Sequence, residues 1–243
     1  MGLFDWFRKN KKQANAPSSA PKPPVESEHD RAVQAAANAR LAYFRQLGEV
    51  SKDVLAPILG PMITGEPQWP TRPAWRPIRK GASTVLASDG LSDPFADESL
   101  PNTGFGVEIL VETADSLGEN LQASWLFHLM YQVSANAASH GGFRGILEKH
   151  GVVSMEIGSA EGLEAFENEA GRLGVLLGLD MPNQACEFAV PGGTTRVITA
   201  KLLTRAELEY VVGLDAVGRR ALQEKFTSSG SWHTSSLDRP SVI

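Results

Sequence analysis

The sequence predicts an α+β fold in which helices flank a mixed β-sheet. Three observations support this class. Apolar residues recur at helical spacing over residues 29–47. Short β-branched or alternating segments follow at 83–87 and 105–113, as in strands. Two apolar segments within 186–202 flank a Pro-Gly-Gly turn and predict a hairpin, which a regular doubly wound fold does not contain.

The first 28 residues are predicted to lie outside the domain, which then covers residues 29–243. Residues 13–28 are rich in alanine, serine, proline and charge, a composition typical of a mobile linker. The preceding residues 1–12 place an apolar stretch before a basic run, which is the wrong order for a signal peptide. A mobile tail is the favoured interpretation of residues 1–12, and an amphipathic anchor at a membrane surface or partner is the alternative.

The domain is expected to begin with the helix over 29–47, which ends near Gly48. The proline-rich segment from Trp69 to Pro77 predicts an extended connection, and its tryptophans give it surface to bury. After the strands at 83–87 and 105–113, a wide apolar face over residues 121–133 predicts a helix that covers the sheet.

The C-terminal third begins with the predicted hairpin strands, 186–190 and 195–202. Thr204 and Glu207 have the spacing of a capping box, so a short helix is expected from there to Gly213. A further helix is predicted near residues 217–226, followed by an irregular serine-rich tail from residue 227.

Composition and charge limit the function classes. The net charge is −5, and the basic residues gathered near the start make the remaining chain more acidic, which argues against nucleic-acid binding by the domain. The single cysteine, Cys186, excludes an intramolecular disulfide and suits a reducing compartment, so a cytoplasmic location is expected.

The sequence predicts no metal, no cofactor and no catalytic residue. Its five histidines lack the close spacing of zinc ligands. Gly104-Phe105-Gly106 lacks a third glycine at Ile109, so a dinucleotide loop is not indicated. Cys186 lies in a predicted strand as an inert thiol. We therefore expect a protein that is not an enzyme; the alternative is a metal-independent hydrolase using His140 with the acidic loop near residue 90.

That loop is the candidate surface for a protein partner. It carries four carboxylates without the spacing of an EF-hand, Asp89, Asp93, Asp97 and Glu98. We expect a solvated acidic loop or an acidic binding patch that selects a basic partner.

Several short motifs resemble the suppressor-of-fused family, and bacterial members in particular. The first motif runs through Gly90, Leu91, Ser92, Asp93 and Pro94 and continues into Gly104, Phe105, Gly106 and Glu108; the second is the closing Asp238, Arg239 and Pro240. The resemblance covers roughly residues 31–243.

The resemblance implies a non-enzymatic protein-binding domain. Animal relatives hold zinc-finger transcription factors of the Hedgehog pathway by pairing with an extended peptide, whereas bacterial relatives act as immunity proteins that neutralise toxins. This chain is expected to lack the C-terminal half of the animal proteins, so the transcription-factor role is not carried over. A toxin is thus the expected partner, bound by addition of a strand to a sheet edge. A membrane or secretion adaptor acting through residues 1–12 is a third interpretation.

Two charged positions in the motifs have open interpretations. Glu108 shares a strand face with Gly106 and Leu110, so it is either half buried with a partner such as Arg196 or exposed to solvent. Asp238 and Arg239 either pair with each other, hold the tail against the domain, or form a simple turn before Pro240.

Overall fold

The computed structural model describes residues 26–57 and 65–243. The tail, linker and membrane-contacting segment expected over residues 1–28 therefore lie outside the described residues, apart from the last three positions. Among the described residues, no helix is long and apolar enough to cross a membrane.

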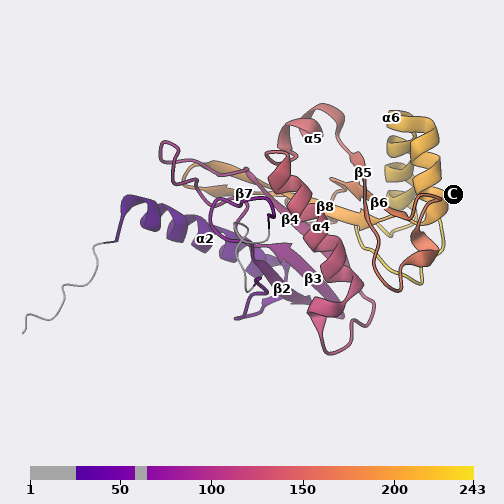
Figure 1. Cartoon of the computed structure of the whole chain (residues 1–243), viewed down its shortest axis with the longest axis horizontal. Coiled ribbons are helices and arrows are strands. Elements are labelled where there is room, and N and C mark those ends of the chain that lie inside the picture. The colour runs from indigo at the N-terminus through magenta and orange to yellow at the C-terminus, as the bar shows by residue number, and fades with distance from the viewer. Residues whose placement is uncertain (1–25, 58–64) are drawn as a thin grey trace, which may run out of the picture.

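In the described part of the chain, a mixed sheet of eight strands is flanked by four α-helices, which confirms the predicted class (Figure 1). The elements are α2 (Glu28–Leu47), β1 (Glu49–Val50), β2 (Trp75–Lys80), β3 (Ser83–Ser88), β4 (Val107–Thr113), η2 (Leu121–Ala123), α4 (Trp125–Ser139), α5 (Arg144–His150), β5 (Val153–Gly158), η3 (Glu164–Phe166), β6 (Arg172–Leu177), β7 (Glu187–Val190), β8 (Gly193–Leu202) and α6 (Arg205–Ser228).

The strands follow the order β1-β2-β3-β4-β8-β6-β5, and β7 pairs with the first part of β8. β4 and β8 are parallel, whereas the other pairs are antiparallel. All seven residues of β4 are buried, as expected for a central strand covered on both faces.

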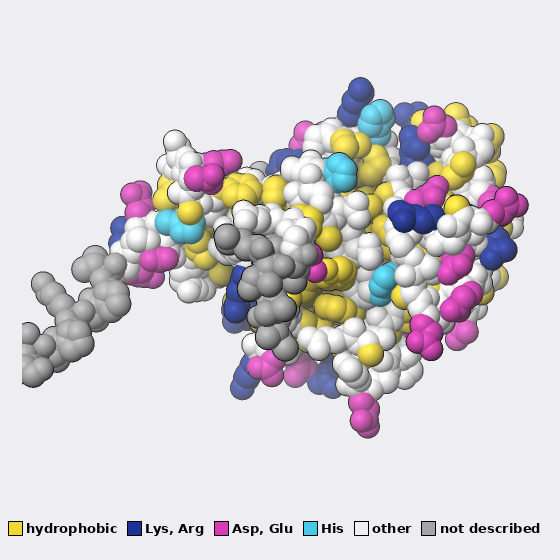
Figure 2. Space-filling view, in the orientation of Figure 1, with side chains coloured by type: hydrophobic (Ala, Val, Ile, Leu, Met, Phe, Trp, Pro, Cys, Tyr) yellow, Lys and Arg dark blue, Asp and Glu magenta, His cyan; other side chains and the backbone are white. Residues whose placement is uncertain are grey.

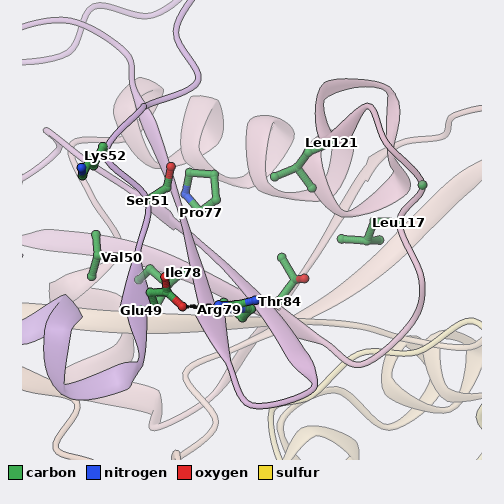
Figure 3. Close-up of a pocket in the computed structure, with 11 residues that line it drawn as sticks. Glu49, Val50, Ser51, Lys52, Pro77, Ile78, Arg79, Thr84, Leu117 and Leu121 are labelled. Atoms are coloured by element: carbon green, nitrogen blue, oxygen red, sulfur yellow. Dashed lines mark hydrogen bonds and ion pairs between the residues drawn. The ribbon is translucent and has the colours of Figure 1, made fainter.

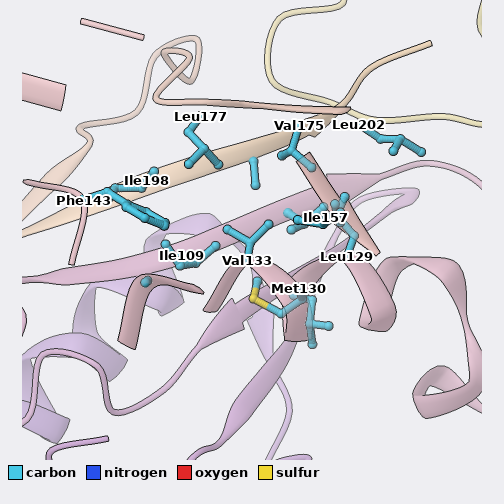
Figure 4. Close-up of a cluster of buried hydrophobic side chains, with 14 of the residues drawn as sticks. Ile109, Leu129, Met130, Val133, Phe143, Ile157, Val175, Leu177, Ile198 and Leu202 are labelled. Atoms are coloured by element: carbon cyan, nitrogen blue, oxygen red, sulfur yellow. The ribbon is translucent and has the colours of Figure 1, made fainter. Parts of the chain in front are cut away.

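Three apolar clusters hold the helices to the sheet. α4 packs on one face, where Leu129 and Val133 join Ile109 and Ile198 in the largest cluster (Figure 4). α2 packs on the opposite face through a second cluster that contains Phe44. α6 forms a third cluster over the C-terminal end of the sheet. These side chains remove apolar surface from water, which is the main favourable term in folding.

Helix boundaries follow the capping residues. Ser27 caps α2, and Gly48 ends it as predicted. Thr204 and Glu207 form the predicted capping box of α6. α6 breaks at Asp215, whose φ is 52°, so its two halves correspond to the two short helices that the sequence predicted.

Other predicted elements differ in extent from the observed ones. α4 begins at Trp125, because the Ser124 hydroxyl accepts a hydrogen bond from the Phe127 N–H, and residues 121–123 form a 3₁₀ turn instead. β4 begins at Val107, after a turn in which Gly106 has a φ of 67°. The expected extended connection ends in strand β2, with Trp69 and Trp75 buried. The predicted hairpin is confirmed as β7 and β8.

Candidate functional site

The family-motif segment surrounds one buried carboxylate. Glu108 of β4 is fully buried. Its Oε1 accepts hydrogen bonds from the Ser92 N–H at 3.0 Å, the Ser92 hydroxyl at 2.6 Å and the Gly90 N–H at 3.3 Å, while Oε2 accepts from the Ser88 hydroxyl. Complete burial raises the pKa of Glu108 to about 7, against the opposing attraction of Arg40 and the hydrogen bonds from Ser88 and Ser92.

The counter-charge comes from α2, which is distant in sequence. The Arg40 side chain is 2% exposed and reaches Asp89 at 2.6 Å, Asp93 at 2.8 Å and Glu108 at 3.5 Å. Although burial acts to lower the pKa of Arg40, the attraction of these three carboxylates raises it above its ordinary value. The expectation that Arg196 would pair with Glu108 is therefore wrong, because Arg40 takes that role.

Asp89 and Asp93 lie inside this network and not on a solvated acidic loop. Arg76 binds the second oxygen of Asp89 at 2.6 Å, and the Thr71 hydroxyl donates to the second oxygen of Asp93 at 2.7 Å. Both carboxylates line a cavity of about 420 Å³, but each is already paired with an arginine. The network thus joins α2, β2 and β4 and serves the fold.

A second buried charge pair holds the C-terminal tail to the domain. Arg239 contacts Glu207 through both of its terminal nitrogens, the shorter contact being 2.5 Å, and also donates to the Leu202 carbonyl at 2.9 Å. Burial acts to raise the pKa of Glu207, but Arg239 and backbone N–H donors lower it below its usual value. The tail is therefore held against the domain, as one of the interpretations of Arg239 expected.

The tail also enters the sheet. Ser235 is fully buried, and its N–H donates to the Glu112 carbonyl of β4 at 2.8 Å. Its hydroxyl accepts from the Leu202 N–H of β8 at 3.0 Å, so the residue bridges the two strands where their own pairing has ended. Next to it, the buried Lys201 ammonium donates to tail carbonyls and lies 4.5 Å from the centre of the Phe226 ring.

A groove opens beside β1, the strand at one edge of the sheet. The groove has a volume of about 640 Å³, within the range of ligand pockets. Leu117 and Leu121 face Val50 and Pro77 across it, while the exposed Glu49–Arg79 ion pair lies at its rim (Figure 3).

β1 is also the end strand of the sheet among the described residues. The Ser51 N–H donates to the Pro77 carbonyl at 2.9 Å, so it points toward β2. Antiparallel pairing alternates along a strand, and the N–H and C=O of Val50 therefore point away from β2. Within residues 26–57 and 65–243, no strand pairs with this outer edge of β1, so an apolar groove lies next to a sheet edge of the kind that extended peptides bind.

Among the described residues, the remaining reactive side chains do not assemble into a catalytic group. The His140 ring bonds to the carbonyl of Asn136 in its own helix at 2.8 Å, and no carboxylate among the described residues contacts it. Burial raises the pKa of the Cys186 thiol and lowers its nucleophilicity. Within residues 26–57 and 65–243, no three His, Cys, Asp or Glu side chains are grouped as metal ligands.

Comparison with solved structures identifies the fold. A crystal structure of the Sufu–Fu complex superposes with a TM-score of 0.50 and 13% sequence identity, over 87% of this chain and 92% of that chain. The fold is that of suppressor of fused. A crystal structure of Drosophila Suppressor of Fused gives a TM-score of 0.49 and 15% identity, and this chain spans about half of its length, 51%. No protein-family model matches the chain, and no curated protein matches it in sequence.

In this suppressor-of-fused-like fold, the motif residues surround the buried network or shape the turn beside it. Leu91, Ser92 and Pro94 are buried. Gly104 has a φ of 53°, and a Cβ there would lie 2.1 Å from the Asp93 carbonyl oxygen, so only glycine fits. The Phe105 ring packs edge-on against Phe95, with centroids 5.1 Å apart.

The other predicted site residues lie at the surface. Asp97 and Glu98 are exposed, and they are the members of the acidic set that a partner can reach freely. Asp238 is also exposed and its N–H donates to the Ser236 hydroxyl, while Pro240 follows Arg239 in the held tail. The groove beside β1 was not anticipated, because its lining comes from segments as far apart in sequence as Glu49 and Leu121.

Proposed function

We propose that this chain is a non-enzymatic protein-binding module that receives an extended segment of a partner protein at the edge of its sheet. The observation that carries the proposal is the groove beside β1, which has an apolar lining and lies next to the end strand of the described sheet. An added strand would gain main-chain hydrogen bonds from that edge and place an apolar side chain near Leu117 and Leu121.

The partner class follows from the fold and from the motif resemblance. One similar solved structure is a complex of Sufu with Fu, which supports a role in protein–protein contact. The bacterial resemblance of the motifs and tail supports an immunity protein that neutralises a toxin in the cytoplasm. Among the described residues, the buried carboxylates Asp93 and Glu207 each pair with an arginine within the fold.

Co-expression with the product of the neighbouring reading frame tests this proposal, because an immunity protein is usually encoded beside its toxin. We expect a complex of sub-micromolar affinity and protection of cells against the toxin. Leu117→Asp places a charge in the groove and is expected to weaken the complex at least tenfold, since it removes the burial of a leucine-sized contact. A complex that forms equally well with Leu117→Asp would refute the groove as the binding site.

The matched control for this experiment is Val217→Asp, which makes the same chemical change on the exposed α6 surface. Its unfolding free energy and that of Leu117→Asp are measured by urea titration, so that loss of binding is separated from loss of folding. Binding that is lost in Leu117→Asp and kept in Val217→Asp supports the proposal.

A further inference from the structure

The break in α6 carries an exposed apolar surface far from the groove. Val212, Leu214 and Val217 are 63, 46 and 70% exposed, and they are three of the five large hydrophobic residues exposed in the described part of the chain. All lie within three residues of Asp215, where the helix breaks. We call these three residues the α6 tip. Such a cluster of exposed large apolar side chains marks an interaction site more often than scattered ones do.

Uncompensated negative charge borders the α6 tip. A groove of about 300 Å³ runs between α6 and the turn from β5 to β6, with Leu208 and Val212 as its apolar part. Glu156, Glu169 and Glu209 line the same groove, and none of them forms a salt bridge with another described residue. Figure 2 shows acidic side chains gathered at the end of the molecule that carries α6. The surface fits a segment with apolar side chains followed by basic ones.

The chain itself contains a segment of this chemistry. Residues 3–7 read Leu-Phe-Asp-Trp-Phe, and residues 8–12 carry four lysines and arginines. Residues 1–25 contain five basic residues and one aspartate, a net charge of +4; because the whole chain carries −5, residues 26–243 carry −9. The N-terminal segment and the domain are therefore opposite in charge, which favours their encounter.

We propose that the α6 tip and its acidic groove bind residues 3–12 of a second copy of this chain. Figure 1 shows the start of α2 and the helix α6 at opposite ends of the molecule, so a second copy delivers its N-terminal segment without crossing the length of the domain. The contact is head-to-tail: when two copies bind, one still has an unused α6 tip and the other an unused N-terminal segment, so further copies can add. Assembly therefore grows with protein concentration. It uses a surface distinct from the groove beside β1 and is independent of the proposed function.

Sedimentation velocity of the full chain over a wide range of concentrations tests the proposal. The weight-average sedimentation coefficient is expected to rise with concentration and to fall back as salt is added, because the acidic groove and the basic segment are screened. Val217→Asp and Trp6→Ala are each expected to weaken association about tenfold or more, through the lost apolar contact. Leu117→Asp, on the other groove, is expected to associate like the unaltered chain.

A mixture of the two weakened variants gives the sharpest result. Val217→Asp keeps an intact N-terminal segment, and Trp6→Ala keeps an intact α6 tip, so the mixture is expected to form a one-to-one complex that neither variant forms alone. The proposal is overturned if the full chain stays monomeric at all concentrations. It is equally overturned if association persists in Val217→Asp, or if the mixture fails to form the complex.

Discussion

Replacing Arg40 with methionine should cost the domain a large part of its stability. The Arg40 side chain is 2% exposed, and the three carboxylates that it contacts are 7, 6 and 0% exposed. Arg40→Met keeps the volume but leaves these charges without their shared partner, which costs about 3–5 kcal/mol. Because domains of this kind unfold with about 5–15 kcal/mol, the loss is readily measured. With an m-value of about 2 kcal/mol/M, the urea midpoint falls by about 2 M.

The loss should depend on pH in a defined direction. The pKa of Glu108, raised to about 7, lies above its value of 4.5 in the unfolded chain, so the folded state binds more protons between these limits. Its contribution to stability is complete below pH 4.5 and is lost as pH rises through 7. Arg40→Met removes an attraction that lowers the pKa of Glu108. In the variant this pKa is therefore higher, and the pH range over which stability falls extends to higher pH. The difference in unfolding free energy between Arg40→Met and the unaltered chain is expected to be smallest at pH 5 and largest at pH 8.

A matched variant separates the effect of losing a buried ion pair from the effect of losing a positive charge. Arg79→Met breaks an ion pair whose partners are 73 and 70% exposed, and solvent screening is expected to make its effect on the unfolding free energy far smaller than that of Arg40→Met. Adding Glu108→Gln to Arg40→Met should restore part of the lost stability, since it removes one of the stranded charges. The reasoning about the network is refuted if Arg40→Met lowers the unfolding free energy no more than Arg79→Met does at every pH.

Three further predictions concern the tail and the motif turn. The pKa of Lys201 is lowered to about 7 by burial, so stability rises with pH from about 7 to 10.5, and Lys201→Met should flatten that part of the urea-derived stability curve. Arg239→Met should cost about 3–5 kcal/mol and expose the tail to carboxypeptidase, whereas Arg219→Met, at a pair whose aspartate is 89% exposed, should cost under about 1 kcal/mol. Gly104→Ala should lower the calorimetric melting temperature far more than Gly141→Ala, because both have positive φ but only the first would meet another atom.

The sequence predicted those elements whose signals are local. The capping box at Thr204 and Glu207, the glycine turn of the hairpin and the helical periodicity of α2 each lie within a few residues, and each was confirmed. β5, β6 and α5 were not predicted. β6 is a short apolar run between Gly171 and Gly178, and periodicity alone does not distinguish such a run from a piece of buried helix.

The buried network was not predicted because its charges come from separate segments. Asp89 and Asp93 stand among glycine, serine and proline, a composition that indicates a solvated loop. Arg40, which binds them, lies about 50 residues earlier in the sequence. The spacing of residues in its helix gives no sign of this contact. The expected partner of Glu108, Arg196, was chosen without knowing the strand register. Non-local pairing of charges lies beyond what a single sequence shows.

The position of Ser235 in the sheet determines when the sheet can form during synthesis of the chain. β4 and β8 leave a gap in the middle of the sheet that is filled by a residue 123 positions after Glu112, to which it is hydrogen-bonded. Contacts of such long separation form late and slow the folding of a domain. On the ribosome, the sheet cannot close until the tail has emerged, so a nascent chain stalled before residue 235 should remain open to chaperones and proteases.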